Sequence, residues 1–276
     1  MFIFVCLFRC LKWISFIIPH WIFTNTRYNY LLKMCTVTYI PTKKNNFIFT
    51  SNRDEAPKRS ATGVIEKSIE GKVLLYPKDA LANGTWISIS NKNQLVCILN
   101  GAFIKHKHRP PYRLSRGIMA LDFFKYPTAN DFFEKFEFDG MEPFTMIIFD
   151  DGRLHEFRWD EKEKHIAHLD TSKQYIWSSC TLFTEDWQEK RRIWFDDWKR
   201  ENQMIDQNAV LDFHRNGGEG HANFDVVMKW KDVVCTTSIT SILKEEGQMS
   251  MRYEGLLNRE IEYGFLKLQT TKNTRD

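Results

Sequence analysis

The chain has 276 residues, of which 43% are apolar and 27% are charged. This composition excludes a disordered, collagenous or disulfide-scaffold protein, and the length suits one large domain with a substantial core. The excess of 39 basic over 35 acidic residues comes from residues 1–33, which hold four basic and no acidic residues, so that 39 − 4 = 35 remain against 35. The rest of the chain is therefore neutral overall, and we expect no nucleic-acid partner.

Residues 1–33 are strongly apolar but fit neither a membrane span nor a signal peptide. Arg9 and Lys12 interrupt the apolar run, and no small-residue cleavage site follows it. We expect an unused upstream start, with translation beginning at Met34. An export or anchor segment and a genuine extension are the alternatives, and a membrane becomes a partner only if the segment is retained. We expect a single domain over residues 34–276.

The cysteines and histidines indicate reduced thiols and no metal site. The six cysteines are dispersed along the chain without a C-x-x-C pair, which favours free thiols in the cytoplasm. The eight histidines show no metal-ligand spacing. We therefore predict a cytoplasmic protein without a metal.

Taken in chain order, the hydrophobic pattern is mostly that of strands. Residues 35–40 alternate and are rich in β-branched side chains, and a polar turn joins them to a second strand at 47–51. Further strands are predicted at 72–76, 85–90, 94–99, 144–149, 154–159, 164–168, 174–177, 232–242 and 261–268. Helices are predicted at 115–124, 130–136 and 185–205. This order predicts an α+β layered domain.

The first predicted hairpin holds the residues with the clearest chemistry. Removal of Met34 would make Cys35 the first residue, with an α-amine of pKa about 7.7–8.0 that can accept the thiol proton. The second strand leads into Arg53 and Asp54, which the hairpin returns beside Cys35. Arg53 would lower the thiol pKa and Asp54 would hold the α-ammonium. Neighbouring strand residues point to opposite faces, so both side chains reach one site only if the strand ends or bulges there.

Several short motifs resemble the NRDE family, also called transport and Golgi organisation protein 2-like. These motifs are Met34-Cys35-Thr36, Ser51-Asn52-Arg53-Asp54-Glu55, Asn83-Gly84-Thr85-Trp86-Ile87 and Leu99-Asn100. The resemblance is strongest over residues 34–113 and continues more weakly to the Thr236-Thr237 strand. It implies an N-terminal nucleophile hydrolase fold, which is a four-layer αββα sandwich. It also implies similarity to choloylglycine hydrolases and penicillin V acylases, which cleave amides through an acyl-cysteine.

The resemblance also implies roles for particular residues. Cys35 matches the nucleophile, Asp54 the acid that orients the amine, and Arg53 an arginine near the thiolate. Asn100 resembles the asparagine that donates a hydrogen bond where negative charge develops. The residues expected to contact substrate are Asn52, Glu55, Trp86 and Ser179.

The sequence departs from the amide-cleaving relatives at three places. Arg53 is adjacent to Asp54 rather than about three residues earlier, Ser178-Ser179 replaces a pair with asparagine, and the arginine expected just before Thr236-Thr237 is absent. The family's animal members are linked to haem trafficking and to lipid or coenzyme A metabolism. The alternative function is therefore a non-catalytic carrier of haem or an acyl lipid on the same fold, and haem would be a ligand only in that case.

Each of these residues also has a purely structural interpretation. Cys35 would be a small buried apolar residue, residues 52–55 a solvated strand end with a local ion pair, and Trp86 part of the core. The leading hypothesis is a cysteine amidohydrolase or acyltransferase-like protein whose small-molecule substrate carries an amide or thioester bond.

Overall fold

A computed structural model describes residues 35–43, 45–180, 185–231 and 233–269. One sheet, sheet A, contains β1 (Thr36–Pro41), β2 (Phe47–Glu55), β10 (Tyr175–Ser178), β11 (Lys229–Trp230), β12 (Val234–Glu245), β13 (Gln248–Gly255) and β14 (Ile261–Lys267). The other, sheet B, contains β3 (Ala61–Ile69), β4 (Lys72–Asp79), β5 (Ile87–Ser90), β6 (Gln94–Asn100), β7 (Phe144–Asp150), β8 (Arg153–Trp159) and β9 (Lys164–Leu169). The helices are α1 (Arg116–Asp122), α2 (Ala129–Lys135), α3 (Glu185–Glu201) and α4 (Gln207–Asn216), with short 3-10 helices at Pro57–Arg59 and Phe123–Lys125.

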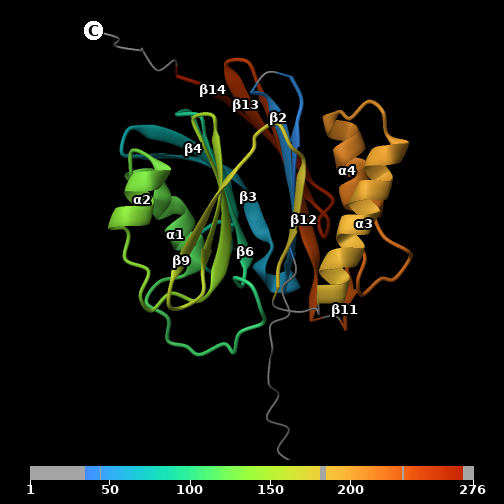
Figure 1. Ribbon diagram of the computed structural model, residues 1–276, viewed down its shortest axis with the longest axis horizontal. Coiled ribbons are helices and arrows are strands. Elements are labelled where there is room, and N and C mark those ends of the chain that lie inside the picture. The colour runs from blue at the N-terminus through green and yellow to red at the C-terminus, as the bar shows by residue number, and fades with distance from the viewer. Residues whose placement is uncertain (1–34, 44, 181–184, 232, 270–276) are drawn as a thin grey trace, which may run out of the picture. The chain divides into compact units, whose positions relative to one another are not determined.

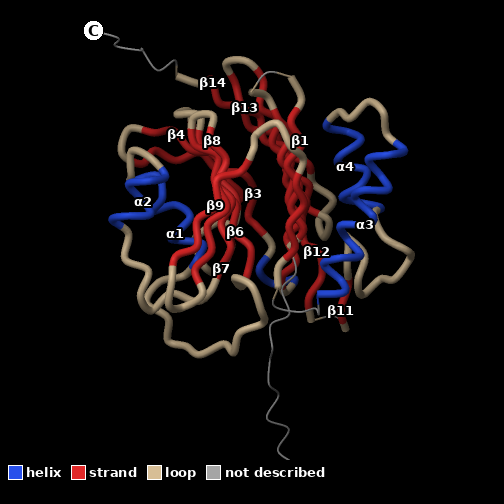
Figure 2. The backbone as a smooth tube through the Cα atoms, in the orientation of Figure 1, coloured by secondary structure: helices blue, strands red, loops and turns tan. Residues whose placement is uncertain are grey.

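The two antiparallel sheets pack face to face, and helices cover their outer faces (Figures 1 and 2). The strand order is β10-β1-β2-β12-β13-β14 in sheet A and β3 through β9 in sequence order in sheet B. Helices α1 and α2 pack on sheet B, and α3 and α4 pack on sheet A. These layers confirm the expected α+β fold and the four-layer αββα sandwich.

Three apolar clusters hold the layers together, and β6 shows why. Alternate residues of a strand point to opposite faces. Leu95, Cys97 and Leu99 join the core between the sheets, whereas Val96 and Ile98 pack beneath α1 and α2. Because both faces of β6 are buried, its sequence is a nearly continuous apolar run. The third cluster fills the space between sheet A and the helices α3 and α4.

The sequence pattern did not predict β3, β11, β13 and α4, nor the short 3-10 helix at Pro57–Arg59. Strand β3 is an edge strand with consecutive exposed polar residues, so it lacks clear alternation. The predicted helix over residues 185–205 is too long, because α3 ends at Glu201 and a new helix begins at Gln207. Asp206 caps that second helix by accepting a hydrogen bond from the backbone N–H of Ala209 at 2.8 Å.

The hairpin of β1 and β2 sets the position of the predicted nucleophile. Val37 pairs with Ser51 in an antiparallel register, so Cys35, two residues earlier, lies level with Arg53, two residues later. The expected extension at 1–33 lies outside the described residues. No helix in the described part of the chain is long and apolar enough to cross a membrane.

Candidate active site

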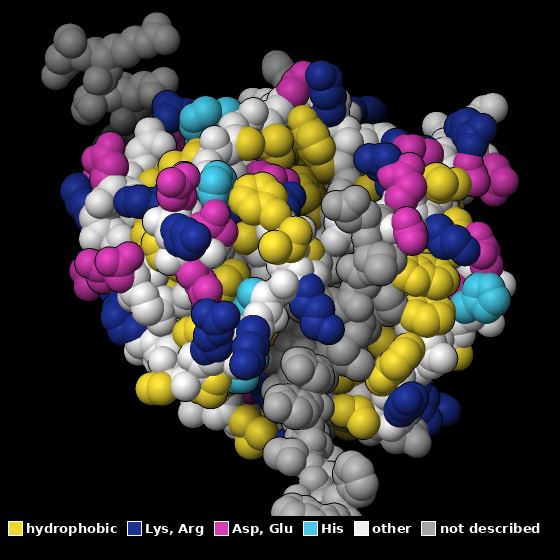
Figure 3. Space-filling model, turned by 60° about the horizontal axis from the view of Figure 1, so that its bottom comes forward, with side chains coloured by type: hydrophobic (Ala, Val, Ile, Leu, Met, Phe, Trp, Pro, Cys, Tyr) yellow, Lys and Arg dark blue, Asp and Glu magenta, His cyan; other side chains and the backbone are white. Residues whose placement is uncertain are grey.

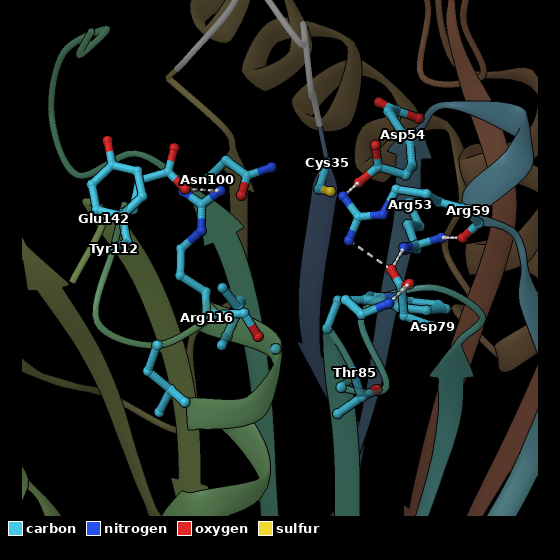
Figure 4. A pocket seen from close by; sticks show the side chains of 18 of the residues that line it. Cys35, Arg53, Asp54, Arg59, Asp79, Thr85, Asn100, Tyr112, Arg116 and Glu142 are labelled. Atoms are coloured by element: carbon cyan, nitrogen blue, oxygen red, sulfur yellow. Dashed lines mark hydrogen bonds and ion pairs between the residues drawn. The ribbon is translucent and has the colours of Figure 1, made fainter. Parts of the chain in front are cut away.

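A cavity of about 380 Å³ lies between sheet A and sheet B and contains all four predicted catalytic side chains. Figure 4 shows Cys35, Arg53 and Asp54 on one side and Asn100 on the other. Further lining residues include Glu55, Arg59, Asp79, Trp86, His108, Tyr112, Arg116 and Glu142. The hairpin supplies the first wall, and β6 with the loop that follows it supplies the second. Residues far apart in sequence therefore meet at one site.

The thiol of Cys35 faces this cavity immediately before β1. Its backbone nitrogen donates a hydrogen bond to the hydroxyl of Ser179 at 3.1 Å, and its carbonyl accepts one from the Ser179 N–H at 3.1 Å. Burial, and to a lesser extent the nearby carboxylate of Asp54, raise the pKa of the Cys35 thiol to about 11. While Met34 is attached, the thiol is therefore almost entirely protonated at neutral pH.

Asp54 is a buried carboxylate that is only partly satisfied. Its Oδ1 accepts a hydrogen bond of 2.6 Å from the hydroxyl of Thr236, whereas its Oδ2 has no hydrogen-bond partner among the described residues. Burial raises the pKa of Asp54 to about 7, although the positive charge of Arg191 acts in the opposite direction. An unpaired buried carboxylate oxygen is costly, so this atom is suited to receive a charged donor.

A bulge in β12 accompanies the approach of Arg53 and Asp54 to one cavity. Asp54 pairs with Thr236 and Arg53 pairs with Ser238, so Thr237 is an extra residue between them. Such a bulge twists the local strand pair and redirects side chains. The hydroxyl of Thr237 donates to the carbonyl of Arg53 at 3.1 Å. A bulge is one of the two conditions, the other being a strand end, under which the neighbouring side chains of Arg53 and Asp54 can reach one site.

Arg53 is held in a buried network rather than left free beside the thiol. Its guanidinium pairs with Asp79 and lies over the ring of Trp86, with 4.3 Å between the guanidinium carbon and the ring centroid. Arg59 also pairs with Asp79 at 2.8 Å and with Glu55 at 2.7 Å. Burial lowers the pKa of Arg53, while Glu55 and Asp79 oppose this. The network fixes the guanidinium within electrostatic range of Cys35.

The opposite wall combines Asn100 with an ion-paired group centred on Glu142. Arg116 binds one carboxylate oxygen of Glu142 at 2.9 Å, and His106 and His108 contact the other at 3.1 Å and 3.0 Å. Burial by itself would raise the pKa of Glu142, but the hydrogen bonds from His106, the Arg116 charge and His108 hold it at about 2. Asn100 lies beside this group, across the cavity from Cys35 (Figure 4).

The Gly84-Thr85-Trp86 motif serves the backbone as well as the cavity wall. A Cβ on Gly84 would lie 2.4 Å from the carbonyl carbon of Gly117, so only glycine permits this approach. Asn83 has a φ of 55°, in the left-handed region that asparagine tolerates. Trp86 is 7% exposed and belongs to the core while also lining the cavity.

Two of the predicted substrate contacts are not where we expected them. Asn52 is a correction: its side chain does not line the cavity because it points from β2 towards α4. There its Oδ1 lies 2.6 Å from Nδ1 of His214, and its Nδ2 donates to the carbonyls of His214 and Val226, both at 2.9 Å. Ser179 is also not a lining residue, since its hydroxyl accepts the hydrogen bond from Cys35.

Arg191 of α3 is a buried charge that the sequence analysis missed. It is 1% exposed and donates to the hydroxyl of Thr36 at 3.0 Å and to the carbonyls of Phe224 and Asp225 at 3.1 and 2.9 Å. Its charge acts on both Asp54 and Cys35. The available signal was its place on the apolar face of the helix, four residues before Phe195.

The described residues include no group of three or more side chains suited to hold a metal ion. The four cysteines in the described part of the chain, Cys35, Cys97, Cys180 and Cys235, are free thiols.

The face-to-face sheets and the helices on their outer faces form the four-layer arrangement of an N-terminal nucleophile hydrolase fold. Residues 34–213 match the family model described as Transport and Golgi organisation 2. This match covers more than half of the chain, and the protein belongs to that family. No curated protein matches the sequence significantly.

Solved structures with a similar fold include two variants of the conjugated bile acid hydrolase from Clostridium perfringens. A cysteine-to-alanine variant superposes with a TM-score of 0.56 at 10% identity, covering 86% of this chain and 97% of that chain. An arginine-to-leucine variant has a TM-score of 0.50 at 11% identity and covers 87% and 100%. An N-acylethanolamine-hydrolyzing acid amidase ortholog from Caenorhabditis elegans has a TM-score of 0.47 at 14% identity and covers 76% and 92%. At these identities the likeness to the two bile acid hydrolase structures concerns the fold alone.

Proposed function

We propose that the protein is an N-terminal cysteine hydrolase that cleaves an amide or thioester bond after removal of Met34. The observation that carries the proposal is that Cys35 and Asp54 line the same cavity. A thiol opens into a cavity beside a buried carboxylate whose Oδ2 has no hydrogen-bond partner among the described residues. Removal of Met34 would turn the Cys35 amide into an ammonium group, which is the charged donor that Asp54 can accept.

The reaction would proceed through an acyl-cysteine. The α-amine takes the proton of the Cys35 thiol, and Sγ forms a bond to the substrate carbonyl carbon. Asn100 would donate a hydrogen bond to the oxygen that becomes negative. The carbon–nitrogen or carbon–sulfur bond then breaks, and the ammonium returns its proton to the leaving amine or thiol. Water hydrolyses the thioester, which restores the free thiol and releases an acid.

The raised thiol pKa supports the requirement for processing. With Met34 attached, Cys35 has a pKa of about 11 and no amine of its own to act as a base. The new ammonium would add a positive charge near Sγ, which lowers the thiol pKa. Ser179 already holds the Cys35 nitrogen at 3.1 Å, so the amine would be oriented when it forms. The family match begins at Met34, the initiator that we propose.

The proposed location is the cytoplasm, which the free thiols of the described residues support. The proposed partner is a small molecule with an amide or thioester bond, and we propose no nucleic-acid partner.

The alternative function, a carrier of haem or an acyl lipid, has less support. Haem needs a largely apolar wall, whereas several charged side chains line this cavity, among them Arg53, Arg116, Asp79 and Glu142. Saturable haem binding with a Soret shift would nonetheless favour the carrier.

The test begins with the intact mass and the N-terminal sequence of the protein from its native host. Protein that begins at Cys35 is then incubated with a panel of acyl p-nitroanilides and acyl thioesters. We expect product release, together with a mass increase equal to one acyl group on Cys35. Cys35→Ala should abolish both signals, whereas Cys97→Ala, which alters a thiol outside the cavity lining, should retain them. Turnover by Cys35→Ala at the rate of the unmodified protein would refute the proposal.

A further inference from the structure

The loop between β6 and α1 forms part of the cavity mouth, and its charge is one-sided. Residues 101–121 contain no aspartate or glutamate, and the acid-free run extends back to residue 80. His108 and Tyr112 of this loop line the cavity. Figure 1 shows the loop at the lower end of the sandwich, the end at which the chain enters β1. We call residues 101–115 the mouth loop.

The mouth loop separates two kinds of side chain. In the segment Lys105-His-Lys-His-Arg109, the histidines contact Glu142 on the cavity side. The three cations alternate with them and are all exposed. Glu142 itself is already bound by Arg116 at 2.9 Å. The inner carboxylate is thus occupied by its own partners, and the outer surface of the loop is basic.

Two adjacent apolar side chains lie next to these cations. Phe103 is 51% exposed and Ile104 is 75% exposed. Phe103 is held in place, because its ring packs edge-on against His165 with 4.9 Å between centroids and lies 4.9 Å from the guanidinium carbon of Arg158. Figure 3 shows basic and hydrophobic side chains near one another on this face, with acidic side chains on both sides of them. The loop therefore presents a fixed apolar tip with a basic flank.

We propose that the mouth loop docks on the surface of an anionic lipid bilayer. Phe103 and Ile104 would enter the boundary between headgroups and acyl chains, and Lys105, Lys107 and Arg109 would contact anionic headgroups. The combination of exposed apolar and basic side chains favours a bilayer over a soluble acidic partner. Only the bilayer offers an apolar interior in which the apolar side chains can be buried. Docking in this way places the cavity mouth against the membrane. The proposal does not depend on whether Cys35 is a nucleophile.

The test is vesicle co-sedimentation of the full chain. Phosphatidylcholine vesicles are compared with vesicles that also contain phosphatidylserine. We expect binding to the anionic vesicles, weakened by added salt because headgroup contacts are screened. Lys105→Gln/Lys107→Gln/Arg109→Gln should weaken it at least about tenfold. Phe103→Ser/Ile104→Ser should weaken binding to anionic vesicles without removing its salt dependence.

Matched controls change the same kinds of residue elsewhere on the surface. Lys43→Gln/Lys67→Gln/Lys173→Gln removes three exposed cations, and Met204→Ser removes an apolar side chain that is 90% exposed. Both controls should bind as the unmodified chain does. Equal binding by loop and control variants would overturn the proposal, because the contact would then belong to another segment. Binding to soluble polyglutamate in preference to vesicles would also overturn it, in favour of an acidic protein partner.

Discussion

The hydroxyl of Thr236 donates a 2.6 Å hydrogen bond to Oδ1 of Asp54. Thr236 is the register partner of Asp54 and lies next to the bulge in the pairing of β12 with β2. The same Thr236 oxygen accepts a hydrogen bond from the N–H of Met228 at 2.9 Å, so its proton is directed at the carboxylate. One oxygen of Asp54 is thereby fixed, and the other has no hydrogen-bond partner among the described residues. This arrangement leads to the first prediction.

Asp54→Asn should change the pH dependence of stability in the chain that retains Met34. The folded pKa of about 7 lies above the ordinary value of 3.8, so between these values the folded state binds more protons than the unfolded state. The stability of the unmodified chain should therefore fall as the pH rises through this window. Asparagine does not ionise, so the variant does not lose stability in this window. Above pH 7 it should therefore be more stable than the unmodified chain by on the order of 4 kcal/mol. Urea unfolding at low and high pH measures this, and a variant less stable at high pH would contradict it.

Cys35 should react slowly with iodoacetamide while Met34 is attached and quickly once it is removed. With a pKa of about 11, its thiolate fraction near neutral pH is small, and labelling should be about a hundredfold slower than for an ordinary exposed cysteine. In the chain that begins at Cys35, this thiol should be labelled faster than an ordinary exposed cysteine. Peptide mapping separates Cys35 from the partly exposed Cys235. Rapid labelling of Cys35 in the Met34-retaining chain would show that processing is not required.

Asn100→Ala should lower kcat by about 10²–10³-fold on the acyl probe that reports turnover, with a smaller change in KM. The reason is that a donor aimed at the developing oxyanion contributes mainly in the transition state. Asn93→Ala is a suitable control because Asn93 binds Asp151 at 2.9 Å in a turn away from the cavity. An unchanged kcat in Asn100→Ala would remove Asn100 from the proposed mechanism.

Asn52→Ala should destabilise the protein by about 2–3 kcal/mol without altering the rate per folded molecule. The substitution removes both hydrogen bonds to backbone carbonyls and the contact with the buried His214. Chemical unfolding and active-site titration measure the two effects separately. A selective fall in kcat in a fully folded variant would restore Asn52 as a functional residue.

Gly84→Ala should destabilise the protein by about 1–3 kcal/mol, because the added methyl group would overlap the backbone of Gly117. Asn83→Gly provides the contrast, since glycine adopts the observed φ of 55° without strain. Thermal unfolding of the two variants compares them directly. Equal melting temperatures would show that α1 can move away from Gly84 at little cost.

Local patterns in the sequence were sufficient for the hairpin and its chemistry. The alternation in β1, the polar turn after it and the motif at residues 51–55 together predicted that Arg53 and Asp54 return to Cys35, and Val37 does pair with Ser51. These are contacts between residues close in sequence, so spacing and strand period determine them. The order of the elements predicted an α+β layered domain, and the four-layer αββα arrangement followed from the resemblance.

The cavity's second wall was decided by tertiary structure. Arg116 and Glu142 meet through a 2.9 Å ion pair although 26 positions separate them, and Arg191 reaches Thr36 from a helix 155 positions further along the chain. The direction of Asn52 also depended on α4, whose His214 gives it a buried partner. The sequence by itself thus determined the candidate nucleophile Cys35, its hairpin and the residues beside it. Only the packing of sheets and helices decided which distant charges surround that nucleophile, because burial makes each charge seek a partner wherever the fold places one.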